Sequence, residues 1–245
     1  RIKLYINMHY SLLVVGDNIE ERLEPFDENL DVERHVMYTK EELIKQRKDR
    51  LEWQRREGPY SQYLKDPVAY ISKPGLSQEH IRAMQNMHLE YLKTDEELYQ
   101  DAISDVDAED IDPVTGGILT TCNENAKWDW YEIGGRWAGL IVLKDDRTPE
   151  SLPHFSWGWN DEDKEEILAQ GRVDRAMIKD IANLDELPGL VYSFLDENDN
   201  WTETHDDYNF YTDDKDKKEE SENTFKENVL KHLKSLDPDT YLTII

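Results

Sequence analysis

Short apolar runs bounded by turn residues recur along the chain and predict β-strands. Most of them are rich in β-branched or aromatic residues, which fit a pleated and half-buried surface. We expect strands at residues 9–15, 32–38, 140–143, 190–195 and 241–245, and a hairpin partner of the fourth strand at 201–204. The first and the last of these strands are expected to lie in the same sheet.

Apolar residues spaced three and four positions apart predict helices between the strands. We expect them at residues 19–26, 40–57, 77–93 and 224–236, with two shorter helices at 167–171 and 172–184. Asn18 is expected to cap the first helix. Thr39 and Glu42 have the spacing of a capping box, which supports a second helix start. Residues 58–76 contain three prolines and are expected to form a loop.

This order of elements predicts an α+β fold with a mostly antiparallel sheet and flanking helices, because strands and helices do not alternate regularly. A chain of 245 residues can form one large domain or two small ones. We predict a single α+β domain over residues 1–245. It would carry a charged helical insertion at about residues 39–100 and an acidic half at residues 101–245.

Charge is the strongest global feature of the sequence. Lys and Arg number 29 against 55 Asp and Glu, a net charge of -26, and residues 101–245 hold 36 of the acidic residues. A field of this sign repels nucleic acid and anionic membranes and attracts basic protein surfaces or cations. We therefore expect a protein partner with a basic surface, and no direct contact with nucleic acid or membrane. The predicted acidic surface comprises Asp105, Asp107, Glu109, Asp110, Asp112, Asp161, Glu162 and Asp163. Solubility alone explains the same charge equally well.

Composition limits the chemistry further. Mean hydropathy is -0.85, and no apolar run is long enough for a transmembrane helix. Cys122 is the single cysteine, which excludes an internal disulfide and a cysteine-based zinc cage and fits a reducing compartment. The acidic loop at residues 105–116 departs from a calcium-binding loop, because Asp110 occupies the position that requires glycine. We expect neither a metal nor a cofactor.

The stretch from residue 125 to residue 143 concentrates rings, glycines and charges, and it has two interpretations. It could form a ligand or partner pocket with tryptophan walls, a glycine floor and charged anchors. It could equally form an aromatic corner of the core, with an Asp–Arg pair and a glycine bulge, because rings occupy cores more often than they line sites. The binding residues expected in the first case are Trp128, Asp129, Trp130, Gly134, Gly135, Arg136 and Trp137.

An enzymatic version of the pocket needs acid–base groups. Asp129 or Glu132 could act as the base, Arg136 as an anion clamp, and His154 or His9 as the acid–base partner. A second charged group, Asp27, Glu28 and Asn29, could join such a site.

The early sequence Pro25-Phe26-Asp27-Glu28-Asn29 and the central sequence from Asn123 to Trp137 resemble two boxes of a family of uncharacterised bacteriophage and bacterial proteins. Their order and spacing also fit that family. This chain has Phe26 where the family usually has Tyr, and Glu124 where it usually has Pro. The resemblance implies a phage or prophage gene product that is cytoplasmic in the host cell. It implies no particular activity.

Two hypotheses for function follow. The first is a phage-type accessory protein that binds and inhibits a host defence protein, such as a nuclease, by presenting its acidic surface to a nucleic-acid channel. The second is an enzyme or small-ligand-binding protein with its site at the central box. Convergence of Asp27, Glu28, Asp129 and Arg136 on one open cleft would favour the second. Buried rings, with the acids on an outer face, would favour the first. The sequence leaves the oligomeric state open.

Overall fold

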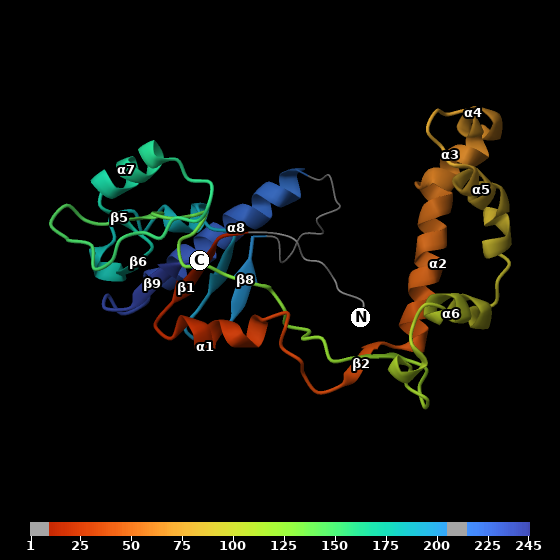
Figure 1. Ribbon diagram of the computed structural model, residues 1–245, viewed down its shortest axis with the longest axis horizontal. Helices are drawn as coiled ribbons and strands as arrows, with labels where there is room; N and C mark the ends of the chain where they lie inside the picture. Colours follow the sequence, from red (N-terminus) through yellow and green to blue (C-terminus); the bar gives the residue numbers. More distant parts are fainter. Residues whose placement is uncertain (1–9, 205–214) are drawn as a thin grey trace. The chain divides into compact units, whose positions relative to one another are not determined.

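The computed structural model describes residues 10–204 and 215–245 (Figure 1). Contacts divide the chain into two compact units. Unit 1 comprises Arg1–Leu30 and Asn123–Ile245, and unit 2 comprises Asp31–Cys122. Unit 2 contains the predicted insertion at residues 39–100 and extends beyond it on both sides. Whether the two units form a single domain stays a prediction.

The described residues of unit 1 form a five-stranded sheet of order β6-β9-β1-β7-β8. β1 pairs in parallel with β7 and antiparallel with β9, and the β6·β9 and β7·β8 pairs are antiparallel. The strands are β1 (Leu12–Val15), β6 (Arg175–Met177), β7 (Ser193–Leu195), β8 (Trp201–Glu203) and β9 (Tyr241–Ile244). The predicted α+β class is confirmed, and so is the shared sheet of the first and last strands. The mostly antiparallel sheet was wrong, because the sheet is mixed. A long connection between β1 and β7 leaves their relative direction free, whereas the short β7–β8 turn imposes an antiparallel pair.

The remaining elements of unit 1 surround this sheet. They are α1 (Ile19–Leu23), η1 (Glu24–Phe26), β4 (Ile141–Val142), α7 (Asp161–Ala169), β5 (Arg172–Val173), η3 (Ile178–Asp180), η4 (Leu187–Gly189) and α8 (Lys215–Leu233). β4 and β5 pair with each other in a small separate sheet. In the described part of the chain no helix is long and apolar enough to cross a membrane.

The two faces of β1 belong to two different clusters of the core, because successive side chains of a strand point to opposite sides. Leu13 and Val15 pack with side chains of α8, which runs beside the strands in Figure 1. Leu12 and Val14 pack with Leu23 of α1 on the other face. Each fully buried aliphatic side chain contributes roughly 1.5–3 kcal/mol relative to an exposed one. The strand is thus fixed from both sides.

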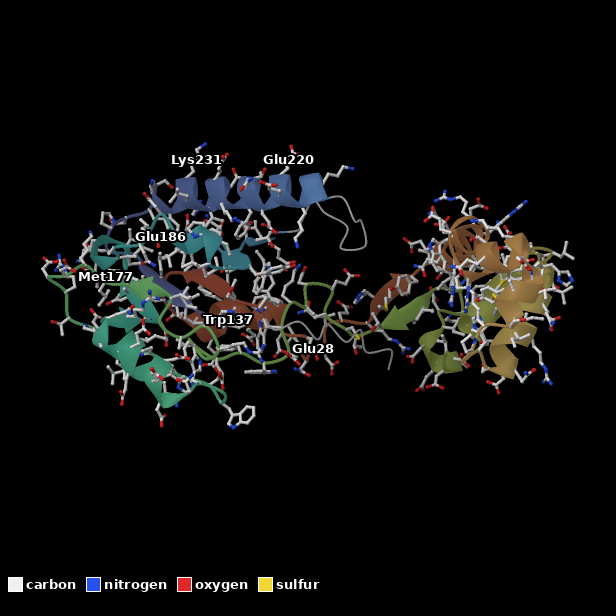
Figure 2. The ribbon with its side chains drawn as sticks, turned by 90° about the horizontal axis from the view of Figure 1, so that it is seen from above. Glu28, Trp137, Met177, Glu186, Glu220 and Lys231 are labelled. Atoms are coloured by element: carbon white, nitrogen blue, oxygen red, sulfur yellow. The ribbon has the colours of Figure 1, made fainter. Side chains whose placement is uncertain are left out.

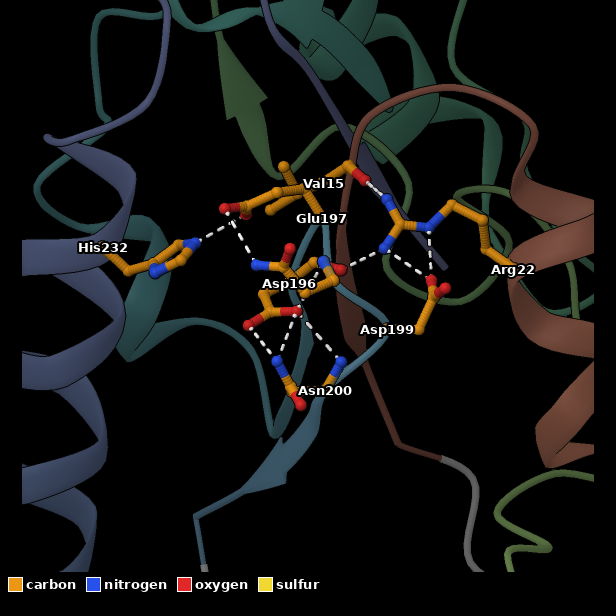
Figure 3. A network of polar contacts seen from close by, with 8 residues as sticks. Val15, Arg22, Asp196, Glu197, Asp199, Asn200 and His232 are labelled. Carbon is orange, nitrogen blue, oxygen red and sulfur yellow. Dashed lines mark hydrogen bonds and ion pairs between the residues drawn. The ribbon is translucent and has the colours of Figure 1, made fainter.

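A polar network joins α1, the β7–β8 turn and α8 (Figure 3). The guanidinium group of Arg22 donates to the carbonyl oxygens of Val15 and Asp196, and it lies 2.9 Å from Asp199 Oδ1. On the far side of the turn, His232 Nε2 of α8 lies 2.7 Å from Glu197 Oε2. These contacts hold the ends of the parallel strands β1 and β7 together.

Unit 2 is mainly helical, with one two-stranded sheet of β2 and β3. Its elements are β2 (His35–Tyr38), α2 (Lys40–Arg56), α3 (Pro59–Lys65), α4 (Pro67–Ile71), α5 (Gln78–Glu90), α6 (Asp95–Ile103), η2 (Ala108–Asp110) and β3 (Ile118–Thr120). The Thr39–Glu42 capping box is present as predicted. The loop predicted at residues 58–76 was wrong, because it contains α3 and α4. Pro59 and Pro67 stand in the first turns of these helices, where a missing N–H costs nothing.

Three further predictions need correction. The helix predicted at residues 172–184 is β5, β6 and η3, since Ala176 pairs with Leu242 of β9. The last long helix begins at Lys215, well before residue 224. Asn18 precedes α1 but has a left-handed backbone and no capping hydrogen bond from its side chain. For β6, pairing with β9 outweighed the local helical pattern.

Candidate functional site

A pocket of about 240 Å³ opens in unit 1 beside the central box. Leu12 of β1 and Ile245 lie on the sheet face opposite α8 and form one side of it. Its other apolar side chains are Leu23 and a set of aromatic rings: Tyr10, Trp128, Trp130, Tyr131, Trp137, Trp157 and Trp201. The charged side chains in the lining are Lys127, Asp129, Glu132 and Arg136. Such a mixture of rings with a few polar groups is typical of a ligand site.

The central box therefore contributes its predicted residues to one cavity. Trp128, Asp129, Trp130, Gly134, Gly135, Arg136 and Trp137 all line the pocket, and so does Glu132. Trp137 is half-buried, whereas Lys231 and Glu220 project outward from α8 (Figure 2). Residues 128–131, within the box, form no regular helix or strand.

Asp27, Glu28 and Asn29 do not line the pocket. They contact the backbone of the residues that do. The Glu28 N–H donates to the Trp128 carbonyl at 2.8 Å, and Asp27 forms an isolated parallel bridge with Trp128. Asn29 Nδ2 lies 3.4 Å from the Asp129 carbonyl. The two boxes thus meet through their backbones. The four charged residues that would mark a single open cleft converge only in part. Asp129 and Arg136 line the pocket, whereas Asp27 and Glu28 do not.

The inner wall of the pocket is held by hydrogen bonds and ring packing. Trp128 Nε1 donates to the Leu23 carbonyl at 2.9 Å, and the Trp128 ring meets Tyr131 edge-on with centroids 5.1 Å apart. Trp130 is 52% exposed and Trp157 is fully exposed. The Trp157 ring is not fixed by burial, so the pocket combines a rigid inner wall with an adaptable ring at its mouth.

The floor is a pair of glycines, of which Gly134 lies against a buried carboxylate. Gly134 and Gly135 have φ values of +71° and +56°, which favour glycine. The carboxylate of Asp174 is buried and accepts hydrogen bonds from the N–H groups of Gly139 and His154, each at 2.6 Å. Burial raises the pKa of Asp174, and the two hydrogen bonds partly offset this rise. Asp174 therefore organises the backbone beneath the pocket.

His154 serves this backbone arrangement through its N–H group, and its imidazole is not part of the pocket lining. The proposed acid–base role of His154 has no geometric support. His9, the other residue considered for that role, lies outside the described residues.

One wall of the pocket contains groups that the sequence analysis missed. The Tyr10 hydroxyl donates to the Lys127 carbonyl, and Lys127 Nζ lies 3.1 Å from Glu203 Oε1. Trp201 Nε1 donates to the same Glu203 oxygen at 2.9 Å. Burial raises the pKa of Tyr10, and the nearby Glu203 carboxylate raises it further. Tyr10 comes from the segment before β1, and Trp201 and Glu203 come from β8, so sheet pairing brings these three to the box.

Asp129, Glu132 and Arg136, three charged residues of the box, are not paired with one another. Across residues 10–204 and 215–245, the side chains of Asp129 and Glu132 have no hydrogen bond or ion pair, and Arg136 has no ion pair. The Arg136 guanidinium carbon lies 6.0 Å from the centroid of the Trp137 ring. The Asp129–Arg136 pair expected of a core corner is thus not formed, and these groups are available to an occupant of the pocket.

The predicted acidic surface divides between the two units. Asp161, Glu162 and Asp163 form the exposed first turn of α7 in unit 1, where Asn160 caps the helix. The other five acids belong to unit 2, where Asp110 pairs with Arg34 at 2.7 Å. Hydrogen bonds from Thr115 and the Val114 N–H lower the pKa of Asp112, which therefore stabilises a local turn. A single continuous acidic surface stays a prediction.

No group of three or more His, Cys, Asp or Glu side chains that could hold a metal occurs in the described segments. No protein-family model matches this chain, and no match was found among curated proteins or among solved structures. The family resemblance of the two boxes therefore stays a prediction.

Proposed function

We propose that this chain is a binding protein whose aromatic pocket takes up a compact organic group. The observation that carries the proposal is the cavity of about 240 Å³ in which rings from four separate segments surround unpaired charged groups of the central box. An aromatic corner of the core would be filled by its own side chains, since protein interiors are close-packed. A cavity with polar groups facing it is the arrangement of a recognition site.

The backbone around the pocket is fixed before any ligand arrives, which favours binding because little ordering remains to oppose it. The Gly134 N–H donates to the Ile244 carbonyl at 2.8 Å, and this bond ties the floor to β9. Trp128 is tied to Leu23 by its indole N–H, as described above. The fully exposed Trp157 ring at the mouth can adapt to the ligand.

Saturation-transfer NMR with three named probes tests the proposal. Indole, cyclohexanol and tetramethylammonium would be offered to the full chain one at a time, and at least one is expected to receive saturation. The Trp130→Ala and Trp137→Ala variants are expected to weaken that signal, because each removes a ring from the lining. Trp53→Ala is the matched control, since Trp53 is 46% exposed and belongs to unit 2. Absence of signal from all three probes, or equal loss in the Trp53 variant, would reject the pocket as a binding site.

Inhibition of a host defence protein is a second proposal, and the exposed acidic start of α7 favours it. Asp161→Lys, Glu162→Lys and Asp163→Lys combined would reverse this charge. Glu219→Lys, Glu220→Lys and Glu227→Lys on the exposed side of α8 form a control with the same change in net charge. Salt-sensitive capture of a basic host protein that is lost only in the α7 variant would support the role. Equal loss of capture in both variants would show that the net charge of the protein, and not the start of α7, causes the binding.

A further inference from the structure

We infer that the pocket selects an organic cation, specifically a compact alkylated ammonium group, and this inference rests on the proposed binding function. Two properties of the lining point to this class: tryptophan faces and an excess of negative charge. Each property is carried by different residues.

The rings supply the first property. Trp128, Trp130, Trp137, Trp157 and Trp201 are five indoles on one cavity, and indole has the most attractive π-face for a cation among the aromatic side chains. Sets of aromatic side chains around a cavity are the usual recognition device for alkylated ammonium groups. A purely apolar ligand would fit rings and aliphatic side chains equally well, so the predominance of indole favours a charged occupant.

The charges supply the second property. Lys127, which would repel a cation, is paired with Glu203 at 3.1 Å. Asp129 and Glu132 retain free carboxylates among the described contacts. Arg136 is exposed and lies beside the Trp137 ring. With the Lys127–Glu203 pair set aside, the lining carries two carboxylates, Asp129 and Glu132, against one basic group, Arg136.

Tyr10 reports the same field from the wall of the pocket. Burial raises its pKa, and the carboxylates of Glu203 and Asp129 add to that rise. The carboxylate part of this rise also opposes an anionic ligand, because a phenolate and an anion would both place negative charge near the same carboxylates. The burial part opposes a charge of either sign, so Tyr10 argues against an anion, and the choice of a cation rests on the carboxylates of Asp129 and Glu132.

The test compares choline with 3,3-dimethyl-1-butanol, which has the same shape without the charge. Calorimetric titration of the full chain at low salt is expected to give choline an affinity about tenfold or more above that of the neutral alcohol. Equal affinities, or tighter binding of the alcohol, would overturn the cation inference and leave the binding function in place. Binding of neither compound would also overturn it, and the three NMR probes then decide whether the pocket binds anything.

Two variants separate the contributions of charge and shape. Asp129→Asn and Glu132→Gln are expected to lower choline affinity about fivefold each and to leave the affinity for 3,3-dimethyl-1-butanol unchanged, since only the cation senses the lost charge. Glu162→Gln on α7 is the control, because it removes the same charge outside the lining. A similar effect of Glu162→Gln, or equal weakening of both compounds, would contradict a local role of the pocket carboxylates. Glycine betaine, which carries a carboxylate beside the same trimethylammonium group, tests whether Arg136 binds an anionic part of the ligand. If glycine betaine binds more tightly than choline and Arg136→Gln removes this difference, Arg136 binds the carboxylate in addition to the cation bound by the pocket.

Discussion

Gly134 lies so close to the buried carboxylate of Asp174 that a Cβ atom at Gly134 would stand 2.0 Å from Asp174 Oδ2. This contact joins the floor of the pocket to the strand segment of β5 and β6. It explains why the central box contains glycine at this position, and why no other residue fits without moving one of the two partners.

Replacement of Gly134 by alanine is therefore expected to destabilise unit 1 by about 2–4 kcal/mol, because the clash and the positive φ act together. Gly171→Ala is the matched control. Gly171 has a similar φ of +63°, and a Cβ atom there would meet nothing within 4 Å. Its expected cost is only about 1 kcal/mol, the cost of the left-handed backbone. Urea unfolding measures both, and equal losses would show that crowding by Asp174 is unimportant.

Asp174→Asn is expected to destabilise the protein, since the side-chain amide offers one acceptor oxygen to the two N–H groups of Gly139 and His154. One buried N–H group left without a partner costs about 1–3 kcal/mol.

The pH dependence of this loss has a defined sign. Burial raises the folded-state pKa of Asp174 above its ordinary value of 3.8. The stability that Asp174 contributes is fully present below pH 3.8, and it declines as the pH rises through the higher pKa of the folded state. The advantage of the wild type over Asp174→Asn should therefore shrink as pH rises above 3.8. An advantage that grows over that range in urea titrations would contradict the raised pKa.

Much of the site could be predicted from local sequence, because the box is contiguous. Trp128, Gly134 and Arg136 lie within nine residues of one another, and rings, a glycine pair and a cation in one segment already suggest a pocket or a core corner. Sequence alone could not decide between these two, since the unfilled space depends on what packs opposite the box. The parallel register Leu12↔Ser193 makes that decision, and no local pattern specifies it.

The site residues that the sequence did not predict also depend on strand pairing. Tyr10 and Trp201 reach the pocket only through the pairing of β1, β7 and β8. Asp174 lies in a segment whose apolar spacing fits a helix, and β9 turns it into strand. The fold class was accessible because strands and helices are marked by local periods, whereas strand direction is not.

Arg22→Ala is expected to destabilise unit 1 by about 2–4 kcal/mol, because it leaves the Val15 and Asp196 carbonyls without their donor and Asp199 without its cation (Figure 3). The Arg22 side chain is only 13% exposed, so water replaces these bonds poorly. Lys231→Ala on the outer side of α8 is the control and should change little. Thermal unfolding followed by circular dichroism compares the two, and a neutral Arg22 variant would show that the network is dispensable.

Asp196→Asn is expected to lower the unfolding midpoint at neutral pH and to flatten the acid side of the stability curve. One Asp196 carboxylate oxygen accepts from the N–H groups of Asn198 and Asn200, at 2.8 and 2.9 Å, and the Asn200 side chain also donates to the carboxylate (Figure 3). Partial burial alone would raise the pKa of Asp196, but these hydrogen bonds outweigh burial and bring it below 3.8.

A carboxyl group with a lowered folded-state pKa adds stability that is present above its unfolded value and is lost as pH falls through the folded one. The wild type should therefore lose stability on acidification below 3.8 more steeply than the Asn variant.

Glu197→Gln on the same turn tests whether the effect is specific to Asp196. Its carboxylate also has a lowered pKa, because the hydrogen bond with His232 outweighs the opposing effect of burial. Glu197→Gln should also cost stability at neutral pH, and its cost should begin to fall on acidification below 4.5, whereas the cost of Asp196→Asn should begin to fall below 3.8. Urea midpoints measured across this acid range distinguish the two carboxylates, and an identical pH profile for both variants would show that the turn titrates as one unit.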